Sequence, residues 1–158
     1  MATFNLSYYR QLKQLVAEKE SLITRDKDLF ADPTFLELLA LKASIENQVF
    51  YNHKNNYFTL IQKYLNETIN PNIFRAQFIK MVNEDIKKSQ EILNNFEELS
   101  TFWIDLESDE FGSLFQNIHE MCLCAFEFEG QEDAVPETKF RDSIQKTFFK
   151  IQKYLDEG

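Results

Sequence analysis

The chain has 158 residues, of which 44% are hydrophobic, and its formal net charge is −9 at pH 7. With 16 Phe but only three Gly and three Pro, it predicts one folded domain with a substantial core, and it disfavours disorder, a turn-rich β architecture and a glycine-lined phosphate site. We also expect no membrane span and no secretory signal, because no apolar run approaches the roughly 18 residues of a transmembrane helix and no basic stretch precedes an apolar block at the N-terminus.

Amino-acid usage bears on the compartment. Two cysteines do not make a disulfide framework, which favours a reducing compartment. The chain is poor in Gly, Ala, Arg and Pro and rich in Phe, Ile, Asn and Lys, as is typical of AT-rich genomes, bacterial or organellar. We therefore expect a cytoplasmic protein or a protein of the plastid stroma.

Apolar residues recur with helical spacing through the first third of the chain. The pattern predicts a helix over about 9–23, interrupted only by Lys19. Asp32 followed by Pro33 is typical of a helix cap and a first turn, so a second helix should begin there. Its apolar arc is wide, which predicts a central helix with several neighbours, and the polar stretch 52–56 predicts a turn after it.

The middle of the chain continues the helical spacing. A short helix is expected over 57–65, and Asn70 with Pro71 repeats the helix-start signal. The apolar stripe that follows, over 74–103, fits either one long helix or two helices that meet near Asn94.

Two further helices are expected in the C-terminal third. One begins at Ser108, because two acidic residues follow it and negative charge favours the N-terminal end of a helix dipole. The last begins near Pro136. The predicted fold class is all-α: a single domain over 1–158 that forms an antiparallel helical bundle with an added N-terminal helical hairpin over 1–55.

Charge is distributed unevenly along the sequence. Between Ser89 and Thr138 there are 13 acidic residues and no Lys or Arg, whereas the remainder has 17 basic and 13 acidic residues. A field this asymmetric repels nucleic acid and favours a cationic protein partner. The alternative is a solvated acidic face that serves solubility alone.

The cysteines and histidines do not form a recognisable site. Cys122 and Cys124 lie about 200° apart on a helix, so they cannot share a metal, and His119 with Cys122 leaves a tetrahedral site two ligands short. His53 is expected to be exposed in its polar turn. Because no catalytic or phosphate-binding motif is present, we expect no enzyme activity, no metal and no cofactor.

Aromatic residues in the acidic segment are candidates for partner anchors. Trp103 and Phe126 fit helical stripes, so we expect both in the core, with an anchoring role as the alternative. Phe128 follows the helix beside the acidic loop and is the better candidate for an exposed anchor.

Three segments from about Phe58 onward together form one pattern: "FTLIQKYLNETINPNIFRAQFIKMV", "ESDEFGSLFQNIHEMCLCAFEFEGQED" and "KFRDSIQKTFFKIQKYL". The positions that carry it are Ile69 and Phe74, then Phe128, Glu129 and Asp133, then the closing helix 140–155. The pattern resembles the colicin D immunity protein family over about two-thirds of the chain. The first 55 or so residues have no counterpart in it.

The resemblance implies that residues 56–158 form a small antiparallel four-helix bundle. It also implies a non-enzymatic inhibitor whose acidic side chains fill the basic substrate cleft of a tRNA-cleaving toxin domain in place of tRNA phosphates. The expected contact residues are Glu129 and Asp133 from the motif, Glu127 and Glu132 from local charge, Phe128 as an anchor, and Asp109 and Glu110 from the same acidic segment. The alternative is a helical accessory or assembly subunit, in one version organelle-encoded, that docks on a basic protein surface.

Overall fold

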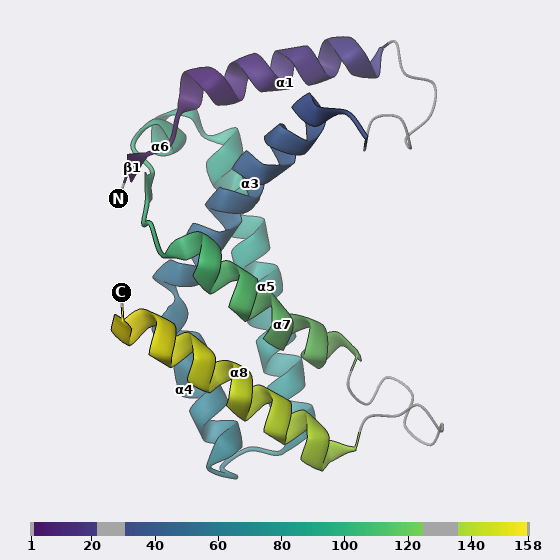
Figure 1. Cartoon of the computed structure of the whole chain (residues 1–158), viewed down its shortest axis with the longest axis vertical. Helices are drawn as coiled ribbons and strands as arrows, with labels where there is room; N and C mark the ends of the chain where they lie inside the picture. The colour runs from purple at the N-terminus through teal and green to yellow at the C-terminus, as the bar shows by residue number, and fades with distance from the viewer. Residues whose placement is uncertain (1, 22–30, 125–135, 158) are drawn as a thin grey trace.

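The structure, a computed structural model, describes residues 2–21, 31–124 and 136–157 (Figure 1). Nearly all of them are helical, which confirms the all-α prediction. The helices are α1 (Leu6–Glu20), α3 (Pro33–Asn52), α4 (Lys54–Leu65), α5 (Pro71–Asn94), α6 (Phe96–Ser100), α7 (Ser108–Cys124) and α8 (Glu137–Glu157). None of these helices is long and apolar enough to cross a membrane.

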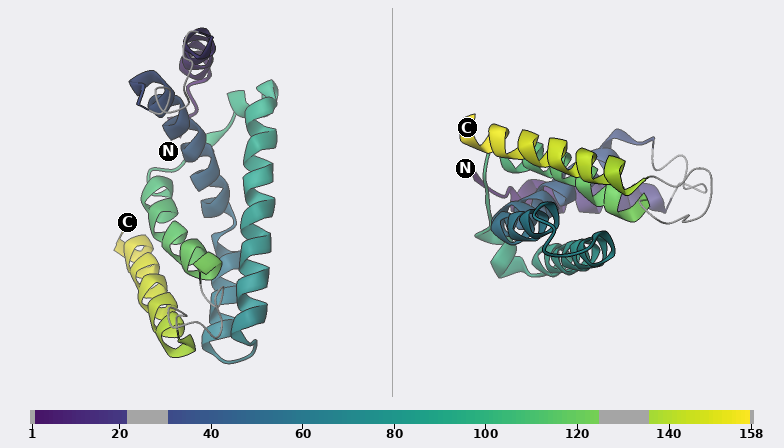
Figure 2. Two further views of the ribbon diagram at one scale, coloured as in Figure 1. Left: turned by 90° about the vertical axis from the view of Figure 1, so that its right-hand side faces the viewer. Right: turned by 90° about the horizontal axis from the view of Figure 1, so that it is seen from below.

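The longest helix, α5, runs along the long axis of the molecule beside α3 and α4 (Figure 2). Helix α7 packs on α3 and α5, and α8 packs on the outside of α7 while also contacting α4. Helix α1 contacts α3 and lies across the far end of the molecule (Figure 1). Helices α4, α5, α7 and α8 thus surround one end, and α1, α3 and α6 lie toward the other.

Side-chain caps begin the helices where the sequence predicted. The Asp32 carboxylate accepts hydrogen bonds from the backbone N–H groups of Thr34 and Phe35 at the start of α3, with Pro33 in the first turn. The Asn70 side chain caps α5 in the same way. Asn95 ends α5 and caps α6, so the stripe 74–103 is divided between two helices.

A bend at His53 separates α3 from α4. The His53 Nδ1 atom lies 2.8 Å from Asp85 Oδ1, and the Tyr57 hydroxyl donates to Asp85 Oδ2 at 2.6 Å. The side chain of His53 is 45% exposed and that of Asp85 is 11% exposed. His53 is therefore exposed, as the sequence predicted, but its ring contacts Asp85, a partner that the sequence did not predict. The signal was missed because Asp85 lies 32 residues away.

The core consists of two clusters of buried residues. The larger cluster, which we call the aromatic core, is built from rings on α4, α5, α7 and α8, together with Phe50 of α3. The smaller one, the N-terminal core, contains mainly aliphatic side chains of α1 and α3, with Ile92 and Leu99. Helix α3 contributes to both clusters and joins them.

Helices α3 and α7 approach closely at Gly112. A Cβ atom at this position would lie 2.1 Å from the side-chain oxygen of Asn47, closer than any normal contact. The missing side chain leaves room for Asn47, whose Nδ2 donates to Asp109 Oδ1 at 3.3 Å. The glycine therefore leaves the space that the Asn47 side chain occupies between these two helices.

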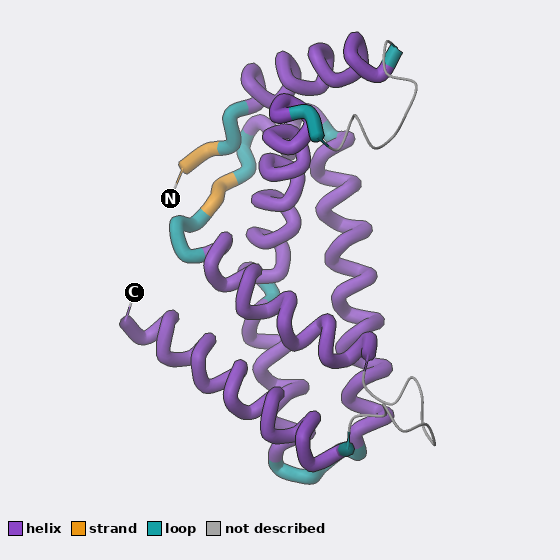
Figure 3. Tube along the Cα trace, turned by 45° about the vertical axis from the view of Figure 1, so that its right-hand side comes forward, coloured by secondary structure: helices purple, strands orange, loops and turns teal. Residues whose placement is uncertain are grey.

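Two short strands, β1 (Ala2–Thr3) and β2 (Trp103–Ile104), pair antiparallel, an element that the sequence did not predict (Figure 3). Trp103 is 54% exposed, so the prediction that it belongs to the core is wrong. The pairing explains the difference, because a strand directs neighbouring side chains to opposite faces whereas the prediction assumed a helical stripe.

Candidate partner-binding surface

The described part of the acidic segment includes a loop that enters α7. It is anchored by Gln48 of α3, whose side chain is 1% exposed. Its Nε2 donates to Asp105 Oδ2 at 2.9 Å, and its Oε1 accepts from the Asp105 backbone N–H at 2.7 Å. The Ser108 hydroxyl donates to the Asp105 carbonyl at 2.8 Å and closes the turn into the helix. The loop is thus fixed to α3 by paired hydrogen bonds, one of them charge-assisted.

Carboxylates gather immediately after this anchor. Glu107, Asp109 and Glu110 lie within four residues at the start of α7, and none of them forms an ion pair with another described residue. Asp109 and Glu110 are exposed, as the sequence predicted for contact residues. Negative charge at the N-terminal end of a helix interacts favourably with the helix dipole, so these residues also stabilise the start of α7.

The negative charge of these carboxylates raises the pKa values of two tyrosines. Burial raises the pKa of Tyr51, and the negative charges of Glu107 and Asp105 raise it further. Burial likewise raises the pKa of Tyr154, with contributions from Glu107 and Glu110. The last turns of α8 therefore lie beside the first turn of α7, and the negative potential extends over both.

Exposed apolar side chains accompany the charges. Trp103 is 54% exposed and Leu106 is 83% exposed. We define the 103–110 surface as Trp103, Leu106, Glu107, Asp109 and Glu110. Aromatic and apolar anchors beside charged groups are typical of protein-binding surfaces.

The remaining predicted contact residues, Glu127, Phe128, Glu129, Glu132 and Asp133, lie outside the described residues, as does Phe126. Asp109 and Glu110 lie at the first end of α7, about 22 Å along its axis from Cys124 at its last residue. Of the sequence-predicted site, this structure therefore places only the first two residues.

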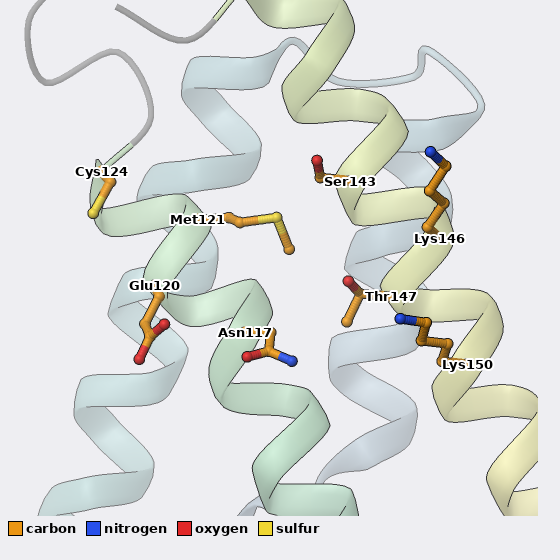
Figure 4. Close-up of a pocket in the computed structure, with 8 residues that line it drawn as sticks. All are labelled: Asn117, Glu120, Met121, Cys124, Ser143, Lys146, Thr147 and Lys150. Carbon is orange, nitrogen blue, oxygen red and sulfur yellow. The ribbon is translucent and has the colours of Figure 1, made fainter. Parts of the chain in front are cut away.

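A groove between α7 and α8 has a different character (Figure 4). It is shallow and open to solvent, with a volume of about 520 Å³. Asn117 and Met121 extend from α7 toward α8, where Ser143 and Thr147 face them. Lys146 and Lys150 of α8 also line it, opposite Glu120 and Cys124. Basic residues of α8 therefore border the later turns of α7, where Glu120 also lines the groove.

The cysteines behave as their spacing predicted. Cys122 is fully buried in the aromatic core and Cys124 is exposed, so they lie on different sides of α7. Burial raises the pKa of Cys122 to about 12, which keeps its thiol protonated and unreactive. Within residues 2–21, 31–124 and 136–157, no three His, Cys, Asp or Glu side chains are close enough to hold a metal ion.

Sequence reasoning did not single out Leu106 and Glu107 of this surface as contact residues, and it also missed buried Gln48, which anchors the loop. Leu106 neither continues nor interrupts an apolar stripe of helical spacing, so its exposure could not be predicted from the sequence. Gln48 did give a signal, because it is a polar residue between Ile45 and Val49 in an otherwise apolar arc of α3. A buried amide in such a position requires a polar partner, which here is Asp105.

Comparison of the chain with protein-family models, curated proteins and solved structures finds no match. The functional argument therefore rests on the charge, exposure and anchoring of the 103–110 surface.

Proposed function

We propose that the chain is a non-enzymatic acidic binding protein that holds a basic protein surface through residues 105–133 of its acidic segment. In the specific form of this proposal, the partner is a tRNA-cleaving nuclease domain and the chain is an immunity-like inhibitor. The observation that carries the proposal is the anchored 103–110 surface, where exposed Trp103 and Leu106 lie beside three carboxylates without ion pairs among the described residues.

The net charge of the chain affects both the rate at which it meets a partner and the class of partner that it favours. A net charge of −9 accelerates encounter with a cationic partner and disfavours nucleic acid itself. A nuclease cleft that binds phosphates presents Lys and Arg side chains, and carboxylates form strong charge-assisted hydrogen bonds with them. The exposed Trp103 and Leu106 side chains would then add apolar burial, which slows dissociation.

The proposed fold relationship assigns the immunity-like four-helix bundle to α4, α5, α7 and α8. These helices surround the aromatic core, and α1 with most of α3 belongs to the N-terminal core. In this proposal, the N-terminal helices are an addition to the inhibitory unit, and α3 supplies Gln48, which anchors the contact loop.

The test compares two sets of three neutralised acids. The surface variant is Glu107→Gln/Asp109→Asn/Glu110→Gln, and the control is Glu84→Gln/Glu91→Gln/Glu97→Gln, at exposed positions on α5 and α6. Both change the net charge by the same amount. The binding partner in this test is the basic nuclease domain that the immobilised chain retains at low salt. We expect the surface variant to weaken its binding at least tenfold, because the variant removes directional contacts, and we expect the control to have a much smaller effect. Equal loss in both would leave only a non-specific field effect.

A second variant tests the part of the site outside the described residues. Reversal of Glu129, Glu132 and Asp133 to Lys should abolish binding with little loss of stability, because surface substitutions typically cost under about 0.5 kcal/mol each. Survival of binding would remove these residues from the interface. Recovery of the chain only with subunits of a stable assembly, and with no nuclease, would instead favour the accessory-subunit alternative.

A further inference from the structure

A polar groove lies where α1, α3 and α5 meet, away from the acidic surface. It consists of two adjoining hollows of about 280 and 210 Å³. They share Tyr9, Lys13, Leu93 and Asn94. The first hollow extends to Lys42 and Glu46 of α3, and the second to Arg10 and Phe96. We call this feature the three-helix groove.

Three cations line the three-helix groove in a chain that is otherwise strongly acidic: Lys13 borders both hollows, Lys42 the first and Arg10 the second. Arg10 and Lys13 project from neighbouring turns of α1, and Lys42 comes from α3. None of the three forms an ion pair with another described residue. The Arg10 guanidinium lies 4.1 Å from the centre of the Phe96 ring, a stacking contact that orients it while leaving its N–H groups free to donate.

The wall of the groove holds a phenol that has no hydrogen-bond partner among the described residues. Tyr9 is 5% exposed and lines both hollows, and its ring packs against Phe4 at 5.5 Å. Among the described residues, the one fully sealed, unpartnered side-chain polar atom is His119 Nε2, so the Tyr9 hydroxyl is not fully sealed from solvent. Burial raises the pKa of Tyr9, which keeps the hydroxyl protonated as a donor. A nearly buried donor of this kind is expected to have an acceptor.

Other polar groups complete the lining. Ser89 is 2% exposed and donates its hydroxyl hydrogen to the Ile86 carbonyl at 2.7 Å, which leaves its oxygen as an acceptor. Gln90 and Asn94 add amides from α5. Glu46 is half-buried, and burial raises its pKa. The groove thus offers three cations and a phenol to an anion, and a few acceptors to a donor beside that anion.

We propose that the three-helix groove binds a small phosphate monoester, with its phosphate held by Arg10, Lys13 and Lys42 and by the Tyr9 hydroxyl. Arginine favours phosphate because its planar fork donates two parallel hydrogen bonds. The two hollows together reach only the lower end of the roughly 300–1,000 Å³ typical of small-molecule sites. A polymeric anion is disfavoured because the net charge of −9 repels it beyond the groove.

The experiment titrates the full chain with phenyl phosphate, inorganic phosphate and benzoate, and follows binding by calorimetry and by backbone amide NMR shifts. We expect saturable binding of phenyl phosphate, weaker binding of inorganic phosphate and still weaker binding of benzoate. The shifts should be centred on α1, on Lys42 and Glu46, and on the last turns of α5. Lys13→Gln/Lys42→Gln should weaken phenyl phosphate binding at least tenfold, and Tyr9→Phe, which removes only the hydroxyl, several-fold.

The matched control is Lys63→Gln/Lys80→Gln, which removes two exposed lysines outside the groove and should leave binding unchanged. Circular dichroism and thermal melting establish that each variant folds. The proposal is overturned by absence of saturable binding, by equal loss in the groove and control variants, or by benzoate binding as tightly as phenyl phosphate. Because the groove shares no residue with the 103–110 surface, failure here leaves the binding-protein proposal standing, and the reverse also holds.

Discussion

The two cores of this molecule differ in composition and in the surface features that they border. Nine of the sixteen buried members of the aromatic core are Phe or Tyr, against two of nine in the N-terminal core. The rings of the aromatic core contact one another closely: Tyr64 stacks on Phe74 at 4.6 Å, and Tyr57 meets Phe115 edge-on at 4.6 Å. The N-terminal core is mainly aliphatic and borders the three-helix groove. We infer that the aromatic core forms the rigid scaffold and that the N-terminal core has more freedom to relax.

The largest expected effect compares one deletion in each core. Phe115→Ala should lower the free energy of unfolding by about 3–5 kcal/mol, because it removes a ring that contacts four others and leaves a cavity. Leu12→Ala should cost about 2–3 kcal/mol, at the low end of its class, because the adjoining groove lets the helices adjust. Urea unfolding monitored by circular dichroism measures both. An equal or larger loss for Leu12→Ala would contradict the contrast between the two cores.

The next effect concerns the contact at the bend between the two ends. Asp85→Ala leaves the buried Tyr57 hydroxyl and the His53 ring without their acceptor, so we expect a loss of about 1–3 kcal/mol. Glu84→Ala, at the exposed neighbouring position, is the control and should cost under about 0.5 kcal/mol. In the Tyr57→Phe background, the cost of Asp85→Ala should shrink. An unchanged cost in that background would show that the hydroxyl contact contributes nothing.

A smaller effect is expected at the crossing of α3 and α7. Alanine is favoured over glycine inside a helix by about 1 kcal/mol, but here its Cβ meets the Asn47 side chain. In the Asn47→Ala background, Gly112→Ala should therefore stabilise the protein by up to about 1 kcal/mol, and in the wild type the gain should be absent or reversed. Thermal unfolding of the four variants in this cycle measures the difference. A similar gain in both backgrounds would mean that the close approach carries no cost.

The smallest effect is a pH dependence at the aromatic end. Burial lowers the pKa of His119 in the folded state, with nearby Glu120 opposing the shift. Between the ordinary histidine value of about 6.5 and the lowered value, the unfolded chain binds more protons, so stability falls as pH falls through that window. His119→Gln should make the decline shallower when unfolding is measured between about pH 7 and pH 5. An unchanged slope would show that His119 titrates alike in both states.

Sequence reasoning predicted what depends on neighbouring residues and missed what depends on distant ones. Caps such as Asp32 and Asn70 and the buried stripe of α7 were predictable because they are set within a few positions. Trp103 was misplaced because its strand partner is Thr3, about 100 residues earlier. The loop anchor at Gln48 depends likewise on a pairing 57 residues apart. Of the candidate site, charge and the positions of Asp109 and Glu110 followed from sequence, but the exposure of Leu106 did not.

The central claim is that the acidic segment occupies the substrate cleft of a basic nuclease. Its most direct test is to measure tRNA cleavage by the basic nuclease domain that the immobilised chain retains at low salt, as increasing amounts of the chain are added. The account predicts inhibition that saturates at one chain per nuclease. Inhibition should be at least tenfold weaker for the Glu107→Gln/Asp109→Asn/Glu110→Gln variant. It should be largely intact for the Glu84→Gln/Glu91→Gln/Glu97→Gln control. Undiminished cleavage at saturating chain, or equal inhibition by both variants, would contradict it.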